Sequence, residues 1–167
     1  TDMISFAGAG AYNHFIPSVV NHLLLRGEFF TAYTPYQPEI SQGTLQAIFE
    51  FQTMIANLTG MQVANASMYD NSSALAEATL MAVRITKKEK ILISAGTHPE
   101  HKHVVQTYLQ ANNLQLEEIP IEDGTTKVPE MQEVAAIIIQ QPNFLGSIEE
   151  LRTIAEKAHE SGALLIV

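Results

Sequence analysis

The sequence predicts an α/β fold with a largely parallel sheet and helices on both faces. Strand-like and helical segments alternate from residue 44 onward, a pattern that favours βαβ units. Residues 135–140 are almost continuously apolar, which is typical of a strand covered on both faces. The chain has 167 residues, 46% of them hydrophobic, and can therefore bury a real core. We expect one domain over 1–167, with an N-terminal helix and extended loop in 1–43 and the alternating core in 44–167.

The N-terminal part predicts helices joined by an extended segment. Residues 17–25 predict a short helix with a proline in its first turn. Residues 29–43 predict an extended loop, because two prolines within them bar a regular helix. A long helix follows, capped by Ser41 and ending near Leu58. Residues 61–64 are a candidate for a short strand.

The alternating core follows from the spacing of its apolar residues and its turn signals. Asp123-Gly124 marks a turn, and 128–133 predict a single helical turn. The remaining elements are predicted, in chain order, as a helix at 72–85, a strand at 90–94, a helix at 99–112, a strand at 114–119, a strand at 135–140, a helix at 148–161 and a strand at 163–167.

Charge and composition exclude several classes of function. Nine basic against eighteen acidic residues give a net charge of −9, so no general attraction to nucleic acid or anionic membranes is expected. No run of about 18 apolar residues predicts a membrane span. The chain has no cysteine, which fits a cytoplasmic protein. It begins at Thr1 and stops on a predicted buried strand, which predicts a fragment of a longer chain. A domain whose last strand is C-terminal is the alternative.

Asn71, Ser72 and Ser73 begin a predicted helix and allow two interpretations. Free backbone N–H groups and the positive end of the helix dipole suit an anion such as a phosphate. The same residues are equally consistent with ordinary capping by Asp70 or Asn71. No Gly-Lys-Ser/Thr follows, so this is not a P-loop.

His98 follows the strand 90–94 at the sheet edge where ligands collect in parallel α/β folds. The alternative is that it caps the helix that begins at Pro99. His98, His101 and His103 are not predicted to bind a metal, because His101 and His103 point to different helix faces and no suitable further ligand is near. Residues 7–12 carry two glycines without the third of a dinucleotide fingerprint.

Two loops are rich in hydrogen-bonding groups. Tyr33–Gly43 combines aromatic residues with a proline-stiffened backbone, which suits either binding or a packed connection. Gln140–Gly146 follows the buried strand 135–140. Its polar groups either face a ligand or satisfy the backbone of the turn.

Four segments, in this order, carry a resemblance to a known family. The sequence resembles the alpha (first) subunit of the decarboxylating glycine dehydrogenase, within the glycine cleavage system P-protein family, over essentially all 167 residues. The segments are Phe6–Pro17 (FAGAGAYNHFIP), Tyr33–Gly43 (YTPYQPEISQG), Asn65–Ala78 (NASMYD, then ALAEA) and Gln141–Gly146 (QPNFLG). Family members are longer at both ends, which also suggests a fragment.

The resemblance implies the aspartate-aminotransferase-like fold of pyridoxal phosphate (PLP) enzymes, fold type I, here as a truncated large-domain core. It implies an oxidoreductase subunit whose holoenzyme decarboxylates glycine with PLP and passes the aminomethyl group to the lipoyl arm of H-protein. PLP and the lysine that binds it are expected on the beta subunit, with nothing covalently bound here. The expected partners are the beta subunit and lipoyl H-protein, and we expect an oligomer.

The resemblance also assigns residues by position. Asn71, Ser72 and Ser73 match the place where fold relatives hold the PLP phosphate, and His98 matches a residue that stacks on the pyridine ring. Relatives more often have glycine where Asn71 stands, so this cradle is expected to be vestigial. Four residues are expected to face the site of the partner: Tyr33, Tyr36, Gln37 and Glu39.

No lysine of this chain is placed to bind PLP. The six lysines lie at the start of a strand, on helices or in a turn, at 87, 88, 90, 102, 127 and 157. The chain alone is therefore predicted to be non-catalytic. The alternatives are a PLP-fold interaction or regulatory module and, less favoured, a self-sufficient enzyme of the aminotransferase type.

Overall fold

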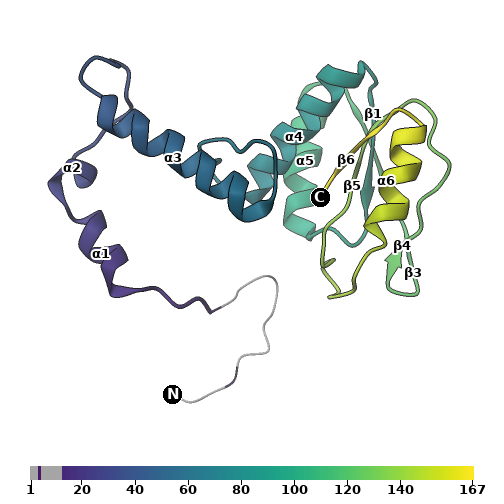
Figure 1. The fold of residues 1–167 in the computed structure, drawn as a ribbon. Coiled ribbons are helices and arrows are strands. Elements are labelled where there is room, and N and C mark those ends of the chain that lie inside the picture. Colours follow the sequence, from purple (N-terminus) through teal and green to yellow (C-terminus); the bar gives the residue numbers. More distant parts are fainter. Residues whose placement is uncertain (1–3, 5–12) are drawn as a thin grey trace. The chain divides into compact units, whose positions relative to one another are not determined.

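A computed structural model describes residue 4 and residues 13–167, which divide after Ser67 into two compact units (Figure 1). The glycine-containing segment 7–12 lies outside the described residues. The second unit begins at Met68 and contains the whole sheet. The helix predicted from Ser41 belongs to the first unit, although the sequence interpretation placed it with the core from residue 44. None of its residues is buried, so it contributes no side chain to a core.

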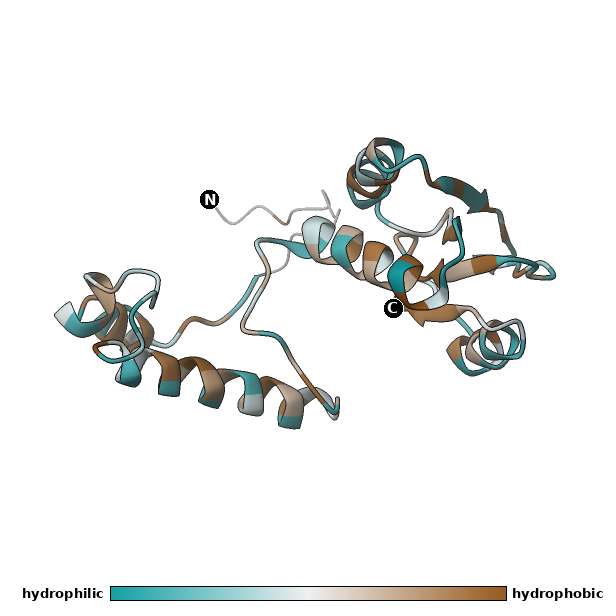
Figure 2. Ribbon diagram, turned by 90° about the horizontal axis from the view of Figure 1, so that it is seen from above, coloured by the Kyte–Doolittle hydropathy of each residue, from teal (hydrophilic) through white to brown (hydrophobic). Residues whose placement is uncertain are grey.

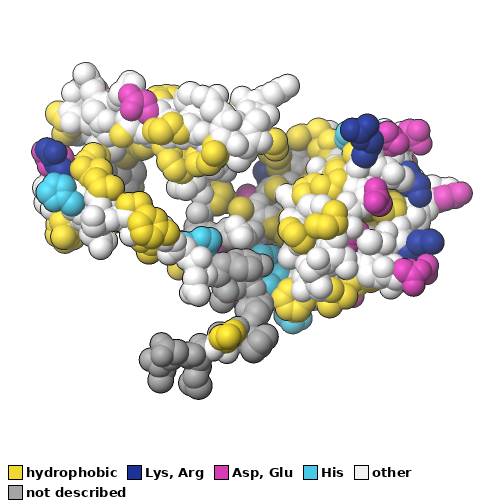
Figure 3. Space-filling model, turned by 60° about the horizontal axis from the view of Figure 1, so that its bottom comes forward, with side chains coloured by type: hydrophobic (Ala, Val, Ile, Leu, Met, Phe, Trp, Pro, Cys, Tyr) yellow, Lys and Arg dark blue, Asp and Glu magenta, His cyan; other side chains and the backbone are white. Residues whose placement is uncertain are grey.

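The first unit is helical, with α1 (Ser18–Leu24), α2 (Gly27–Phe30) and α3 (Gln42–Thr59). Ser41 precedes α3 as predicted, but its side chain makes no capping hydrogen bond. Gly60 ends the helix in the left-handed conformation, with φ of 71°. Large hydrophobic side chains are exposed on this unit, among them Phe15, Phe30, Tyr33, Ile40, Phe49 and Leu58. Hydrophobic side chains at the surface are yellow in Figure 3.

Two predictions for the first unit are wrong. Residues 61–64 form no strand, because the Gln52 amide instead donates to the Ala64 carbonyl (2.8 Å) and ties this segment to α3 as a loop. The start of the predicted loop 29–43 is helical, since Phe29 and Phe30 belong to α2. The chain is irregular only from residue 32, where it approaches the first of the two prolines.

The second unit contains a four-stranded parallel sheet in the order β2-β1-β5-β6. Its strands are β1 (Lys90–Ser94), β2 (Gln115–Ile119), β5 (Val134–Ile138) and β6 (Leu164–Ile166). The helices of this unit are α4 (Asn71–Thr86), α5 (Pro99–Ala111) and α6 (Leu151–Glu160). Helices α5 and α6 are the crossovers that parallel neighbours require. This architecture confirms the predicted α/β class.

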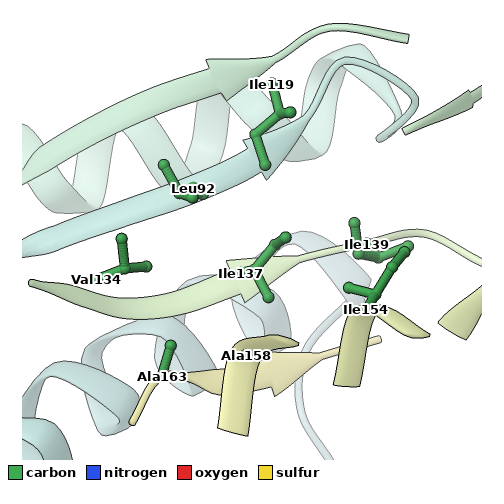
Figure 4. Close-up of a cluster of buried hydrophobic side chains, with 8 residues drawn as sticks. All are labelled: Leu92, Ile119, Val134, Ile137, Ile139, Ile154, Ala158 and Ala163. Carbon is green, nitrogen blue, oxygen red and sulfur yellow. The ribbon is translucent and has the colours of Figure 1, made fainter. Parts of the chain in front are cut away.

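The helices cover both faces of the sheet, as predicted. On one face Leu92 and Ile137 pack against Ile154 and Ala158 of α6 (Figure 4). On the other face Ile91, Ile93 and Ile138 pack against Ala76 of α4 and against Val105 and Leu109 of α5. Alternate residues of each strand point to opposite faces, so an apolar run is needed where both faces are covered. All five residues of β5 are buried, and the central strands are correspondingly brown in Figure 2.

The connection before β5 differs from its prediction. Residues 128–133 form no helical turn. Val128 and Met131 pack against the sheet cluster, which draws this segment over the core in an irregular conformation. Before it, a short hairpin joins β3 (Ile121–Glu122) to β4 (Thr125–Thr126) around the predicted Asp123-Gly124 turn. Both turn residues have positive φ, 51° and 83°, as a tight hairpin requires.

Among the described residues, no helix is long and apolar enough to cross a membrane.

Candidate functional site

The candidate site lies at the C-terminal edge of the parallel sheet, where open α/β folds bind ligands. Two loops reach this edge: the β1–α5 loop (residues 95–98) and the β5–α6 loop (residues 139–150). The start of α4 lies near the start of α5, since the charge of Asp70 acts on His101 in the first turn of α5.

The start of α4 is closed by a capping box. The carboxylate of Asp70 accepts from the Ser73 backbone N–H and from the Ser73 hydroxyl, both at 2.7 Å. In return, the Asp70 backbone N–H donates to the Ser73 hydroxyl at 3.2 Å. Asn71 and Ser72 occupy the first two helical positions between these partners. Of the two interpretations of this helix start, the structure forms the cap.

The cap also bears on whether a phosphate suits this position. The pKa of Asp70 is lowered below its ordinary 3.8, first by the Ser73 hydroxyl and then by the Ser73 backbone N–H. The positive end of the α4 dipole therefore already faces an anionic group of the chain itself. A phosphate placed here would meet a like charge. The Asp70 carboxylate therefore disfavours a PLP phosphate at this helix start.

Replacing Asp70 by asparagine is expected to remove an acid-dependent part of the stability while it keeps the cap. A carboxyl whose pKa is lowered by folding stabilises the folded state above its unfolded pKa, and this stabilisation is lost as the pH falls through the lower, folded pKa. The Asp70→Asn variant should therefore show a smaller fall in melting temperature between about pH 5 and pH 2 than the parent chain. Glu28→Gln, at another exposed carboxyl with a lowered pKa, should show the same kind of change because it loses the contact with Arg26, so it is a second test of the rule. Identical dependence of the melting temperature on pH for Asp70→Asn and the parent chain would contradict the lowered pKa of Asp70.

His98 caps α5, which confirms the capping alternative for this residue. Its Nδ1 accepts from the Glu100 backbone N–H at 3.2 Å, and its own backbone N–H donates to the Gln140 side chain at 2.8 Å. The ring meets the edge of Phe144 at 4.9 Å between centroids and stacks on His101 at 4.7 Å. The ring is thus held on two sides by aromatic neighbours and lies half-buried at the sheet edge.

His101 connects His98 electrostatically to the start of α4. Its pKa is lowered, first by burial and then by the neighbouring His98, while the charges of Asp70 and Glu100 act in the opposite direction. The structure therefore brings the predicted residues 71–73 and 98 into one region of the second unit. Their assignment to a cofactor stays a prediction.

The four residues predicted to face a partner lie in the first unit. All four residues are exposed. The rings of Tyr33 and Tyr36 contact each other, with their centroids 6.2 Å apart. The side chains of Tyr33 and Tyr36 remain 82% and 77% exposed. Their aromatic surface is thus available for contact with another molecule.

Most of the lysines are engaged in structural contacts. Lys88 donates to the Ser161 and Gly162 carbonyls at the end of α6, at 2.9 and 3.2 Å. Lys102 reaches the Ala95 carbonyl at the ligand edge but pairs with Glu118 at 2.9 Å. Two further ion pairs are Lys90–Glu117 and Lys127–Glu122. No group of three or more potential metal ligands occurs among the residues that the structure describes.

The polar residues of the β5–α6 loop mainly satisfy its backbone, one of the two alternatives predicted for Gln140–Gly146. Oδ1 of Asn143 accepts from the Leu145 and Ser147 N–H groups, at 3.1 and 3.0 Å. The Gln141 side chain accepts from the Glu149 N–H at 2.8 Å. Sequence reasoning missed Glu149, whose buried carboxylate joins this loop to the β3–β4 hairpin. An acidic residue between Ile148 and Leu151 gave no signal of burial.

Comparison with known proteins gives a consistent result. The family model of the glycine cleavage system P-protein matches residues 1–167. The chain is 54% identical over 169 residues to a probable glycine dehydrogenase (decarboxylating) subunit 1 of Desulforamulus reducens, covering 98% of this chain and 38% of that protein. Similar proteins of the same description occur in Geobacillus kaustophilus, at 54% identity, and Brevibacillus brevis, at 55%, with the same coverage of both chains.

A solved structure is similar along nearly the whole chain. It is the crystal structure of glycine decarboxylase (P-protein) of the glycine cleavage system in inhibitor-bound form, with a TM-score of 0.90 and 53% identity. The similarity covers 95% of this chain and 36% of that one. The chain thus spans about 38% of the length of the curated relatives it matches.

Proposed function

Because this chain belongs to the glycine cleavage system P-protein family, we propose that it forms part of the first (alpha) subunit of a two-subunit glycine dehydrogenase (decarboxylating). The match of the family model to all 167 residues carries this proposal. The identity of 54% to subunit 1 proteins supports the choice of the first subunit. Such a subunit belongs to an oxidoreductase.

The proposed complex decarboxylates glycine and transfers the aminomethyl group to the lipoyl group of H-protein, with release of CO2. We place PLP on the partner (beta) subunit. The carboxylate cap of α4 supports this placement, because a phosphate at this helix start would meet the like charge of Asp70. In this proposal Asn71, Ser72, Ser73 and His98 are the remnant of a cofactor site that now serves as two helix caps.

We propose that the chain contributes to the shared active site through Tyr33, Tyr36, Gln37 and Glu39. The exposure of both tyrosines supports this role, since large aromatic side chains left in solvent are typical anchors of protein interfaces. The lack of cysteine is compatible with a cytoplasmic location, which belongs to the same proposal.

The alternative function is a non-catalytic PLP-fold module that only binds or regulates another protein. Four of the lysines are held in hydrogen bonds or ion pairs, which favours a chain without a catalytic lysine: Lys88, Lys90, Lys102 and Lys127. That observation is shared by both candidates, so an experiment with the partner subunit is needed to separate them.

Mixing the full-length subunit that contains this chain with its beta partner is expected to restore glycine-dependent exchange of labelled CO2, supported by H-protein. Neither subunit alone should give this exchange, since one lacks the lysine and the other lacks part of the site. Tyr33→Ala in the mixed complex should lower the exchange, whereas Tyr108→Phe on α5 of the second unit should not. Equal exchange by the beta subunit alone would refute the proposal. Stable pairing without any stimulation would favour the regulatory module.

A further inference from the structure

Glu149 is a buried acid without a basic partner. Its residue is 4% exposed and lies in the β5–α6 loop, next to the candidate site. None of the ion pairs among residues 13–167 includes it. A buried carboxylate is costly unless hydrogen-bond donors surround it. Such a residue therefore needs a local explanation.

Three donors from two separate segments supply that compensation. The Thr126 backbone N–H and hydroxyl donate to the Glu149 carboxylate at 2.8 and 2.9 Å, from the β3–β4 hairpin. The Asn143 amide donates to it at 2.8 Å, from within the β5–α6 loop. The carboxylate accepts in all three contacts, so it joins the hairpin to the loop.

Asn143 transmits this constraint to the tip of the loop. It is itself 4% exposed, and its amide nitrogen also donates to the Gly124 carbonyl at 2.9 Å. Its oxygen accepts from the Leu145 and Ser147 N–H groups, which shapes the loop tip. The backbone around Phe144 is therefore held from both sides.

The same loop holds His98 through two contacts. The Phe144 N–H donates to the Gly96 carbonyl at 2.7 Å, and the Phe144 ring packs its edge against the His98 ring. The Gln140 side chain accepts from the His98 N–H at 2.8 Å. Displacement of the loop would therefore move the ring that lies at the ligand edge.

A second chain of hydrogen bonds joins Glu149 to the β1–α5 loop. The Gly96 N–H donates to the Ser94 hydroxyl at 2.9 Å, and the hydroxyls of Ser94 and Thr126 are 2.5 Å apart. Because the Thr126 hydroxyl donates to Glu149, it accepts from Ser94. All the donors therefore point toward the carboxylate, and Glu149 is the acceptor on which the series ends.

We propose that Glu149 is the positioning residue of this edge: its buried carboxylate fixes the β5–α6 loop and, through Phe144 and Gln140, the place of His98. This deepens the proposed function, since it names what shapes the edge at which the subunit would meet ligand or partner. Hydrogen exchange measures the amides directly and needs no catalytic activity. Its failure is therefore distinguishable from a failure of the proposed function.

Hydrogen exchange followed by mass spectrometry, on the full-length subunit bound to its partner, tests the proposal. In Glu149→Gln an amide N–H replaces an acceptor and faces the donors of Asn143 or Thr126. We expect amide exchange about tenfold faster in peptides covering 143–147 and residue 98, because buried donors lose their acceptor. The neighbouring exposed Glu150→Gln is the matched control and should leave both peptides unchanged.

A second variant separates positioning by hydrogen bonds from the charge of the buried side chain. Thr126→Val leaves the Glu149 carboxylate in place and removes one of its three donors, so exchange at residue 98 should become faster, to a smaller extent than in Glu149→Gln. This variant also tests the proposal if Glu149→Gln does not fold. Unchanged exchange at residue 98 in these variants, or an equal effect of Glu150→Gln, would overturn the proposal.

Discussion

Replacing Ile137 by alanine is expected to lower the free energy of unfolding by about 2–5 kcal/mol. The Ile137 residue is fully buried in the middle of β5, where it packs with Leu92, Val134 and Ile154 (Figure 4). Strand β5 lies between β1 and β6 and is buried at all five positions, so its backbone cannot easily move to fill a cavity. The loss combines the missing apolar contacts with the void that remains.

Urea unfolding of the full-length subunit measures this loss as a shift in the midpoint at constant slope. Ile85→Ala is the matched control, because Ile85 lies on α4 with 61% of its surface exposed. Its cost should stay within about 0.5 kcal/mol. Similar costs for the two variants would show that β5 is not the centre of the core.

Replacing Gly96 by alanine is expected to cost about 1–3 kcal/mol and to disturb the candidate site. A Cβ at this position would lie 3.0 Å from the Asn143 Cβ and 3.2 Å from both the Ile121 Cδ1 and the Ser94 Oγ. Asn143 cannot yield easily, since its side chain is held by four hydrogen bonds. The β1–α5 loop must therefore move, and the His98 ring with it.

Thermal unfolding measures the cost, and a crystal structure of the variant would show the displaced loop. Gly43→Ala is the matched control, since no atom lies within 4 Å of a Cβ added there. Gly43 lies in the first turn of α3, where alanine should stabilise by about 0.5–1 kcal/mol. Equal tolerance of alanine at both glycines would contradict the close packing of the β1–α5 loop.

The sheet was predictable because its strands carry their environment in their own residues. An apolar run such as 135–140 is stable only in a strand that is covered on both faces of the sheet. The predicted helices between the strands then indicate that neighbouring strands are parallel. The hairpin turn at Asp123-Gly124 was equally readable, since both residues tolerate positive φ. The conformation of residues 61–64 was not predictable, because a strand forms only beside a pairing partner and the local sequence does not show whether one is available.

The candidate site was predictable only in its location. The predicted strands and helices assigned Asn71–Ser73 to a helix start and His98 to a loop after a strand. The structure brings these residues into one region. Whether a helix start is capped or binds an anion depends on the side-chain conformation of Asp70, which is compatible with both before folding.

The sequence by itself determined the α/β class, the order of the strands along the chain and the family. These follow from local periodicity and from residue strings that need no knowledge of distant contacts. Only the tertiary structure decided that Asp70 closes the start of α4 and that Glu149 is buried among donors. Thr126 lies 23 residues before Glu149, and such a contact forms only when the sheet brings the hairpin to the β5–α6 loop. Side-chain hydrogen bonds between distant segments are set by the fold, so they cannot be read from the segments themselves.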